Sequence, residues 1–389
     1  MSMLPPTMSE PAATVIRLRC GTLTLRVESA AMPLEELCTF GSRRNRKRGF
    51  LFISKVLGKH VPVRPSLMLR VHETLAGQIA GVQGPVVVIA LAETATGLGQ
   101  GVFEALLRQT GRDDVVFLHS TRYRLAQPPA LAFCESHSHA TQHLMYFPFD
   151  PKHRELLENA CTLVLVDDEL TTGRTLTHLA REFLRINARV ETVHFVSITD
   201  WLGTERRRAI ADELLRPARF HALLRGTLHF EANAAFEPGP TPDVTGGDVP
   251  KDEFLPMNFG RLGVSGALGL DLGRLERAAE LRGGERVLVL GTGEFSHSPY
   301  LLALHLERRG WAVHFQSTTR SPILLGEGIS TVHEFIDNYH DEIPNYVYNV
   351  HPERYDRIII GYETWPLPQA HRLADILGAR TLFFGRDGL

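Results

Sequence analysis

The sequence is poor in cysteine, in long apolar runs and in net charge. Its four cysteines, Cys20, Cys38, Cys134 and Cys161, have no paired spacing, so neither a disulfide framework nor a CxxC metal site is indicated. The longest apolar runs, such as Val86–Ala92, have the length of a strand and are too short to cross a bilayer. The formal net charge of −2 gives the chain no overall attraction to nucleic acid or to an anionic membrane. We therefore expect neither as a partner.

The length of 389 residues exceeds that of one ordinary domain, and a hydrophobic content of 43% is enough for packed cores. Met1–Ala13 lacks the basic start and the apolar core of a secretory signal, so we expect a cytoplasmic protein with reduced thiols. Phe236–Pro256 is dense in proline, glycine and aspartate, which disfavour helix and strand, and is predicted to be a linker. The predicted organisation is N-terminal strands in 1–40, a first domain in 41–235, the linker in 236–256 and a second domain in 257–389.

Apolar strand-like runs alternate with helical patterns before the linker. In the clearest helical pattern, Leu176, Leu179, Phe183 and Ile186 fall on one face. This alternation predicts an α/β fold with a parallel sheet flanked by helices. We place the short N-terminal strands outside this alternating core. The predicted strands are Val86–Ala92, Asp114–Ser120, Cys161–Asp168 and Val190–Ile198, and the predicted helices are Gly99–Thr110 and Thr175–Asn187.

The second half repeats this alternation, and three of its segments align with segments of the first half. The aligned pairs are Ile89–Glu93 with Leu290–Glu294, Phe117–Arg122 with Phe315–Arg320, and Leu163–Leu170 with Ile358–Trp365. We interpret the second half as a divergent copy of the same sheet topology. Chance similarity between two α/β sheets is the alternative.

Two adjacent carboxylates, Asp167 and Asp168, follow one of the predicted strands. Parallel α/β sheets bind ligands outside the carboxyl ends of their strands. Two carboxylates there can accept hydrogen bonds from the cis-diol of a ribose. The next loop opens a helix and offers backbone N–H groups, hydroxyls and a glycine, which suit a phosphate. Its residues are Leu170, Thr171, Thr172, Gly173, Arg174 and Thr175. Together these features predict a site for a ribose 5-phosphate unit.

The string Val166–Thr175 resembles the phosphoribosyl-pyrophosphate (PRPP) motif of type I phosphoribosyltransferases, with its strand, two acidic residues and Thr/Gly loop. The resemblance assigns Asp167 and Asp168 to the ribose diol or to the shell of a Mg²⁺ ion, and assigns the loop to the 5′-phosphate. Glu169 departs from the motif at a usually apolar position. Thr171 stands where purine-specific members carry an aspartate, which disfavours a hypoxanthine- or guanine-type enzyme and leaves the acceptor base open.

The resemblance also implies a tight pyrophosphate loop after an earlier strand, commonly with a non-proline cis peptide. The segment Ala90–Gly101 is rich in small residues that let backbone amides approach an anion. The pyrophosphate-binding residues are then Ala92, Glu93, Thr94, Ala95, Thr96 and Gly97. An ordinary strand–helix turn is the alternative.

A long segment, Ser120–Tyr146, is predicted to be a flexible loop that covers the site. Its candidate functional residues are Cys134, Glu135, His137, His139 and His143. We assign catalytic roles to Glu135, His137 and His139, with proton handling by a histidine. A zinc site on this loop and an inert solvated loop are the alternatives.

Two basic stretches, Arg43–Arg48 and Ser54–His60, precede the predicted sheet. Beside a ribose-phosphate site they favour a hood that closes over an anionic ligand. Nucleic-acid binding and a solvated face are the alternatives. The predicted anion-binding residues of the hood and loop are Lys55, Lys59, His60 and Arg122.

Two strings in the second half, Gly260–Gly263 (GRLG) and Thr318–Pro322 (TTRSP), narrow the resemblance. With the PRPP motif they resemble a bacterial two-domain family, in which an orotate phosphoribosyltransferase-like domain precedes a domain named for its TRSP motif. The resemblance covers nearly the whole chain from about Arg43. It implies an association with tellurium-resistance and stress-response gene clusters and a role in making a nucleoside-like metabolite.

The second half lacks the acidic pair, since Gly361 and Tyr362 align with Asp167 and Asp168. We expect that it does not bind PRPP. Its Gly291–Ser298 loop is a candidate for holding an anion or part of a nucleotide. A structural or dimer-forming role, as in a homodimer, is the alternative. The residues of this second-site hypothesis are Gly291, Gly293, Glu294, Arg320, Ser321 and Glu363.

These features together predict a phosphoribosyltransferase that uses PRPP and Mg²⁺ to transfer ribose 5-phosphate to a small base-like acceptor and releases pyrophosphate. A non-catalytic PRPP sensor is the main alternative, because a fold and a ligand motif do not guarantee turnover. The long, histidine-bearing loop favours catalysis, since a sensor has no need to exclude water.

Overall fold

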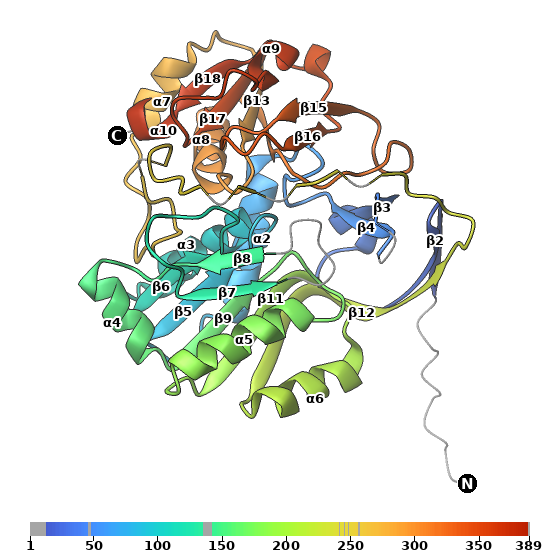
Figure 1. Cartoon of the computed structure of the whole chain (residues 1–389), viewed down its shortest axis with the longest axis vertical. Helices are drawn as coiled ribbons and strands as arrows, with labels where there is room; N and C mark the ends of the chain where they lie inside the picture. Colours follow the sequence, from blue (N-terminus) through green and yellow to red (C-terminus); the bar gives the residue numbers. More distant parts are fainter. Residues whose placement is uncertain are drawn as a thin grey trace.

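Two mainly parallel sheets, one from each half of the chain, form the framework of the molecule (Figure 1). The computed structural model describes residues 13–45, 48–134, 142–240, 242–244, 246–247, 249–255 and 257–387. The first sheet contains β1 (Thr14–Leu18), β2 (Gly21–Ala30), β5 (Val86–Ala90), β6 (Val115–His119), β9 (Thr162–Val166), β10 (Glu169–Leu170), β11 (Thr192–Asp200) and β12 (Ala218–Ala232). Its order is β1-β2-β12-β11-β9-β5-β6, with β10 paired to β11. Because β12, β11, β9, β5 and β6 are parallel, the predicted α/β fold is confirmed.

Helices cover both faces of the first sheet. On one face lie α2 (Pro65–Gln78) and α3 (Thr96–Thr110), and on the other lie α4 (Pro151–Asn159), α5 (Arg174–Ile186) and α6 (Gly203–Leu214). Successive residues of a strand point to opposite faces. Accordingly, Val86 and Val88 of β5 belong to the core beneath α2 and α3, whereas Val87 and Ile89 belong to the core beneath α4 and α5.

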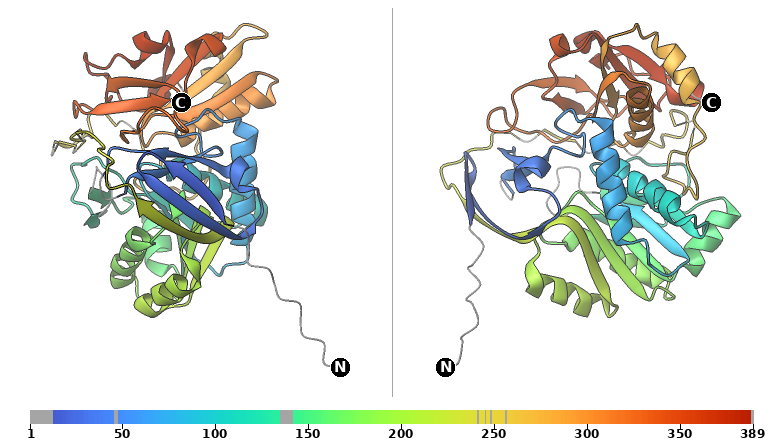
Figure 2. Two further views of the ribbon diagram at one scale, coloured as in Figure 1. Left: turned by 90° about the vertical axis from the view of Figure 1, so that its right-hand side faces the viewer. Right: turned by 180° about the vertical axis from the view of Figure 1, so that it is seen from behind.

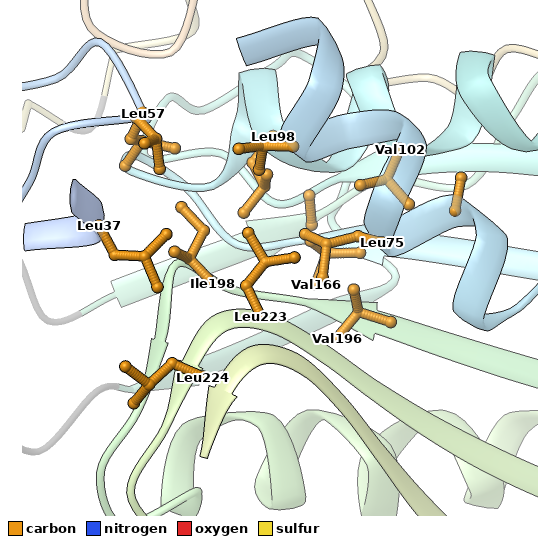
Figure 3. Close-up of a cluster of buried hydrophobic side chains, with 14 of the residues drawn as sticks. Leu37, Leu57, Leu75, Leu98, Val102, Val166, Val196, Ile198, Leu223 and Leu224 are labelled. Carbon is orange, nitrogen blue, oxygen red and sulfur yellow. The ribbon is translucent and has the colours of Figure 1, made fainter. Parts of the chain in front are cut away.

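Figure 3 shows the first of these two cores, where side chains of helices and strands interlock. Leu75 of α2 and Leu98 of α3 lie over Val166 and Val196 of the sheet. Burial of one such side chain contributes about 1.5–3 kcal/mol. The many contacts of this kind hold the carboxyl ends of β5 and β9 in place, and the functional residues follow those ends.

The N-terminal strands belong to the first sheet, so their predicted place outside its core was wrong. β2 pairs antiparallel with β12, and β1 pairs with the other edge of β2. Leu23 and Leu25 of β2 are fully buried in the core. Strand–helix alternation does not reveal such strands, because an antiparallel edge strand needs no crossover helix.

The second sheet repeats the topology of the first. Its strands are β13 (Arg286–Gly291), β14 (Ala312–Ser317), β17 (Arg357–Tyr362) and β18 (Arg380–Phe383), in the order β14-β13-β17-β18 and all parallel. This is the order β6-β5-β9-β11 of the first sheet, with aligned strands in matching places. The second half therefore has the sheet topology that the internal alignment predicts. Its helices are α7 (Leu272–Ala279), α8 (His297–Arg308), the 3-10 helix η1 (Pro352–Arg354), α9 (Leu373–Leu377) and α10 (Phe384–Asp387).

Short antiparallel hairpins flank the two sheets. They pair β3 (Cys38–Ser42) with β4 (Phe50–Ser54), β7 (Leu131–Cys134) with β8 (Gln142–Met145), and β15 (Val332–Ile336) with β16 (Pro344–Tyr348), and the short helix α1 (Leu34–Leu37) precedes β3. The hairpin β7–β8 lies within the segment predicted to be a flexible loop, so that prediction was wrong for these two strands. Residues 135–141 lie outside the described residues.

The two halves pack against each other directly. Helix α2 reaches both, since Leu75 lies in the core of the first sheet and Met68 in a core of the second (Figure 2). Within the predicted linker, Lys251 is packed against the second half and is only 2% exposed. Its Nζ lies 2.6 Å from Oδ1 of Asp341. Across the described ranges, no helix combines the length and the apolar character that a membrane span requires.

Candidate functional site

A cavity lies where the two halves meet, beyond the carboxyl ends of β5 and β9. The first half lines it with Ala92, Glu93, Thr94, Asp167 and Asp168, among others, and the second half with Thr319, Arg320 and Ser321. A neighbouring hollow is lined by 170–175 and shares Arg48, Asp167 and Glu169 with the cavity. The two spaces are therefore adjacent, and together they form the candidate site. This site brings together the two predicted phosphate loops, the acidic pair and the TTRSP string.

The acidic pair turns at the end of β9. The backbone N–H of Asp168 donates to Oδ1 of Asp167 at 3.0 Å, and the carbonyl of Asp168 accepts from the N–H of Ile198 at 3.1 Å. Both aspartates are half-buried and line the cavity. Carboxylate oxygens at the mouth of a sheet suit both a ribose diol and Mg²⁺, which binds one or two carboxylates together with water and substrate phosphate oxygens. The donor set present thus fits the expected ion.

The predicted phosphate loop leads into the start of α5. Gly173 precedes that helix with φ of +67°, a left-handed conformation that favours glycine. A Cβ on Gly173 would lie 2.9 Å from Cδ1 of Ile210, so space as well as backbone conformation requires glycine here. All six loop residues from 170 to 175 line the hollow, although the side chain of Leu170 packs in the core. The helix start therefore faces a space where a phosphate can lie.

The predicted pyrophosphate loop divides between the cavity and the contact with the second half. Ala92, Glu93 and Thr94 line the cavity. Ala95 is buried in the fold, the hydroxyl of Thr96 donates to the carbonyl of Glu294 at 2.9 Å, and Gly97 packs against Ser296. The Ala92–Glu93 peptide is cis, as the resemblance implies. The N–H of Ala92 donates to Oγ of Ser120 at 2.9 Å, which anchors the loop to the end of β6.

The charge of Glu93 is balanced by cations from two directions. Lys59 Nζ lies 2.9 Å from Oε1 of Glu93, and Arg320 Nε lies 3.7 Å from Oε2. Burial alone would raise the pKa of Glu93, but Lys59 and Arg320 outweigh it and lower the pKa below its usual value. Lys59 also donates to the carbonyl of Gly293 at 2.9 Å and to Oγ of Ser317 at 3.0 Å. It therefore joins the loop to the second half.

The predicted hood residues have different places. His60 and Arg122 line the cavity, and Nη2 of Arg122 donates to the carbonyl of Ala92 at 3.3 Å. Burial, with the nearby charge of Lys59, lowers the pKa of His60 to about 3, so its imidazole is neutral at pH 7. Lys59 is buried and contacts Glu93, which itself lines the cavity. Lys55 is exposed and donates to the carbonyl of Glu35 at 2.8 Å, so the structure does not bring it to the cavity.

Two arginines of the basic stretch, Arg43 and Arg48, also line the cavity. Arg48 forms an ion pair with Glu169, which explains the acidic residue at a usually apolar motif position. Burial raises the pKa of Glu169, while Arg48 favours its ionised form. The stretch was predicted to be part of the hood, but neither arginine was predicted individually as a site residue. Their proximity to the motif depends on the hairpin β3–β4, which carries them across the sheet.

The candidate catalytic residues Glu135, His137 and His139 lie outside the described residues. Of the same segment, His143 on β8 is buried and lines the cavity. Its Nδ1 lies 2.9 Å from Oγ of Ser120, and its ring stacks on Phe133 with the ring centroids 4.9 Å apart.

The residues of the second-site hypothesis separate into two groups. Arg320 and Ser321 line the cavity beside the acidic pair of the first half. Glu294 and Glu363 instead bind Arg261, the arginine of the GRLG string. Nη1 and Nη2 of Arg261 donate to the two carboxylate oxygens of Glu363 at 2.7 and 2.6 Å, and Nη2 also donates to Glu294 at 3.3 Å. Gly291 ends β13, and the carbonyl of Gly293 accepts a hydrogen bond from Lys59.

The contact between the halves is reciprocal. Glu93 of the first half lies against Arg320 of the second. The aligned Glu294 accepts from the hydroxyl of Thr121 and from the N–H of Arg122, both at 2.6 Å, and Arg122 aligns with Arg320. Each half therefore places its loop glutamate on the Thr-Arg segment of the other. Contacts of this kind, in which two like surfaces exchange equivalent residues, are typical of a two-fold arrangement.

Two family models match the chain, one in each half. The family described as phosphoribosyl transferase matches residues 37–227, and the TRSP domain, described as C-terminal to that domain, matches residues 268–377. A search of curated proteins found no match.

Two solved structures are similar to part of the chain. The adenine phosphoribosyl transferase from Trypanosoma brucei is 12% identical, over 48% of this chain and 76% of that chain, with a TM-score of 0.34. The orotate phosphoribosyltransferase from Francisella tularensis is 13% identical, over 49% of this chain and 82% of that chain, with a TM-score of 0.29. The family matches carry the conclusion: the chain belongs to the two-domain family in which a phosphoribosyl transferase domain is followed by a TRSP domain.

Proposed function

We propose that the chain is a PRPP-dependent phosphoribosyltransferase that transfers ribose 5-phosphate to a base-like acceptor and releases pyrophosphate. One observation carries the proposal. Two adjacent spaces that share Asp167 are lined by the acidic pair Asp167 and Asp168, by the helix-opening loop 170–175 and by the loop residues 92–94. These three features match the ribose, the 5′-phosphate and the pyrophosphate of PRPP in chemistry.

The chain's own residues then position the reactants. Asp167 and Asp168 accept hydrogen bonds from the ribose hydroxyls, and the start of α5 holds the 5′-phosphate. Mg²⁺, when bound near the two aspartates, would neutralise part of the charge on pyrophosphate. The bond from ribose C1 to pyrophosphate breaks with its electron pair on the leaving oxygen. A nitrogen of the acceptor forms the new bond to C1 and loses its proton. Positioning and stabilisation of the leaving charge are the main contributions of the protein.

The acceptor site is proposed to lie on the His60 and Arg43 side of the cavity, away from the loop 170–175. His60 lines that side as a neutral imidazole, which can both donate and accept a hydrogen bond. A planar heterocycle with its own donors and acceptors fits such a wall. We propose, as the family resemblance implies, that the product is a nucleoside-like metabolite.

The test is calorimetric titration of the purified chain with PRPP and Mg²⁺, beside a variant with Asp167→Asn and Asp168→Asn. Hydrogen bonds to charged groups contribute about 1.5–3 kcal/mol each, so the variant should bind PRPP at least about 10-fold more weakly. Asp113→Asn, at an exposed aspartate before β6, is the matched control and should bind normally. Equal binding by all three proteins would contradict the proposal.

Turnover is tested separately, by measuring pyrophosphate release with a panel of purine, pyrimidine and other heterocyclic bases. Release that depends on one base identifies the acceptor. Tight PRPP binding without release for any acceptor would instead favour the sensor.

A further inference from the structure

We propose that Arg320, the arginine of the TRSP motif, binds the pyrophosphate group of PRPP, so that the second half completes the active site of the first. This inference rests on the proposed function and assigns one role of the C-terminal domain within it. Three observations carry it: the place of Arg320, its hydrogen-bonding state and the way its segment is fastened.

Arg320 lies inside the composite cavity and not on the molecular surface. It is 5% exposed and lines the same space as Glu93, Asp167 and Asp168. It does not line the hollow of the loop 170–175, so the 5′-phosphate is not its partner. The nearest proposed ligand group is the one beside Glu93, which is the pyrophosphate.

Two hydrogen-bond donors of the Arg320 guanidinium are not used within the described part of the protein. Among the described residues, its Nε and Nη2 are buried with no hydrogen-bond partner. Arg261, the other buried arginine of this contact, donates to both oxygens of Glu363 and to Glu294. Nε lies 3.7 Å from Glu93 and Nη2 lies 3.9 Å from Asp341, so both carboxylates are beyond hydrogen-bond distance. Buried polar groups in folded proteins are nearly always hydrogen-bonded, so these two N–H groups favour a ligand that accepts from them.

The two carboxylates near Arg320 each have a second, closer cation. Glu93 lies 3.7 Å from Arg320 but has Lys59 at 2.9 Å, and Asp341 lies 3.9 Å from Arg320 but has Lys251 at 2.6 Å. Each acid therefore has a closer cation. Arg320 is thus the more distant cation of both acids, and a planar guanidinium matches phosphate oxygens in a bidentate geometry.

The first half holds the guanidinium in place. The ring of Tyr123 lies under it, with the guanidinium carbon 4.9 Å from the ring centroid. Tyr123 in turn stacks on Tyr339, with the centroids 3.9 Å apart. Because the side chains of Tyr123 and Tyr339 are both buried, they hold Arg320 in position before any ligand binds. Such preorganisation lowers the entropy cost of binding.

The backbone of the motif is fastened on both sides. The hood segment binds it through the N–H of Arg44 to the carbonyl of Pro322 at 3.2 Å and the N–H of Leu324 to the carbonyl of Ser42 at 2.9 Å. On the other side, Thr319 and Tyr346 exchange two backbone hydrogen bonds of 2.9 and 2.7 Å. Backbone hydrogen bonds therefore hold the hood segment and the TRSP motif together beside the cavity.

The test compares the full chain with Arg320→Met, with Arg320→Lys and with Arg308→Met as control, since Arg308 is exposed on α8. Calorimetry measures binding of PRPP, of pyrophosphate and of ribose 5-phosphate, each with Mg²⁺. Arg320→Met should weaken PRPP and pyrophosphate about 10- to 100-fold and leave ribose 5-phosphate unchanged. Arg320→Lys, which keeps the charge beside Glu93 and Asp341, should fold normally and lose part of the affinity. Arg308→Met should bind all three ligands as the wild type does.

Two outcomes overturn the inference while the proposed function stands. In one, the Arg320 variants bind pyrophosphate as the wild type does. In the other, they bind PRPP normally and raise only the KM of the acceptor, which would assign Arg320 to an acidic group of the acceptor. If the wild type binds neither PRPP nor ribose 5-phosphate, the proposed function fails first and the inference fails with it.

Discussion

Arg261→Met is expected to destabilise the second half of the chain strongly. Arg261 is buried and holds Glu363 through two hydrogen bonds of 2.7 and 2.6 Å, with Glu294 at 3.3 Å. These carboxylates raise the pKa of Arg261 well above its usual value despite its burial. Removing the cation leaves two acids in a site from which water is excluded. Breaking a buried ion pair from one side costs about 3–5 kcal/mol.

A matched control is available at the surface of the same half. Arg380 forms a similar paired contact with Glu280, at 2.8 and 2.7 Å, but the two side chains are 34% and 67% exposed. Exposed pairs contribute about 1 kcal/mol or less, because water and salt screen them. Arg380→Met should therefore be several-fold less destabilising than Arg261→Met, although the two changes remove the same atoms.

The assay is urea unfolding followed by circular dichroism, with the midpoint and slope compared among the wild type and both variants. Adding Glu363→Gln to Arg261→Met should recover part of the loss, since it removes one of the stranded charges. Equal destabilisation by Arg261→Met and Arg380→Met would refute the reasoning. A double variant less stable than Arg261→Met would refute it as well, because the stranded charge would then not be the cause.

Two further predictions concern pH and ligand binding. Burial lowers the pKa of His60, His72 and His119 to about 3 from the usual 6.5, so the unfolded chain takes up protons first and stability should fall as pH drops from about 6.5 toward 3. The free energy of unfolding, measured by urea titration across that range, should fall with decreasing pH. His60→Gln should lower the number of protons taken up on unfolding by up to one. A free energy of unfolding that does not change with pH would contradict the burial of these rings. Arg122→Ala should weaken PRPP binding measured by calorimetry, because Arg122 lines the cavity, whereas Lys55→Ala should not, because Lys55 is exposed elsewhere. Equal effects of the two changes would contradict these placements.

The framework of both halves follows from local patterns in the sequence. β5 and β9 are short apolar runs followed by polar loops, and the face of α5 is visible in the spacing of Leu176, Leu179 and Phe183. The acidic pair was predicted from its resemblance to the PRPP motif, because that motif places two carboxylates and a Thr/Gly loop within a few residues of each other. The internal alignment likewise found the strand order of the second sheet, since each copy carries its own strand signals.

The assembly of the site depended on contacts between residues far apart in the chain. Lys55 is exposed, whereas Lys59 is buried against Glu93. No local pattern distinguishes these two lysines, because they lie four residues apart in a connecting segment without a helical or strand periodicity. The N-terminal strands join the sheet through pairing with β12, which lies nearly at the other end of the first half. Sequence alone determined the PRPP motif and the repeated α/β topology. Only the tertiary structure decided that Arg320 lines the same cavity as the acidic pair of the other half, because packing of two complete sheets, and no local pattern, sets which surfaces meet.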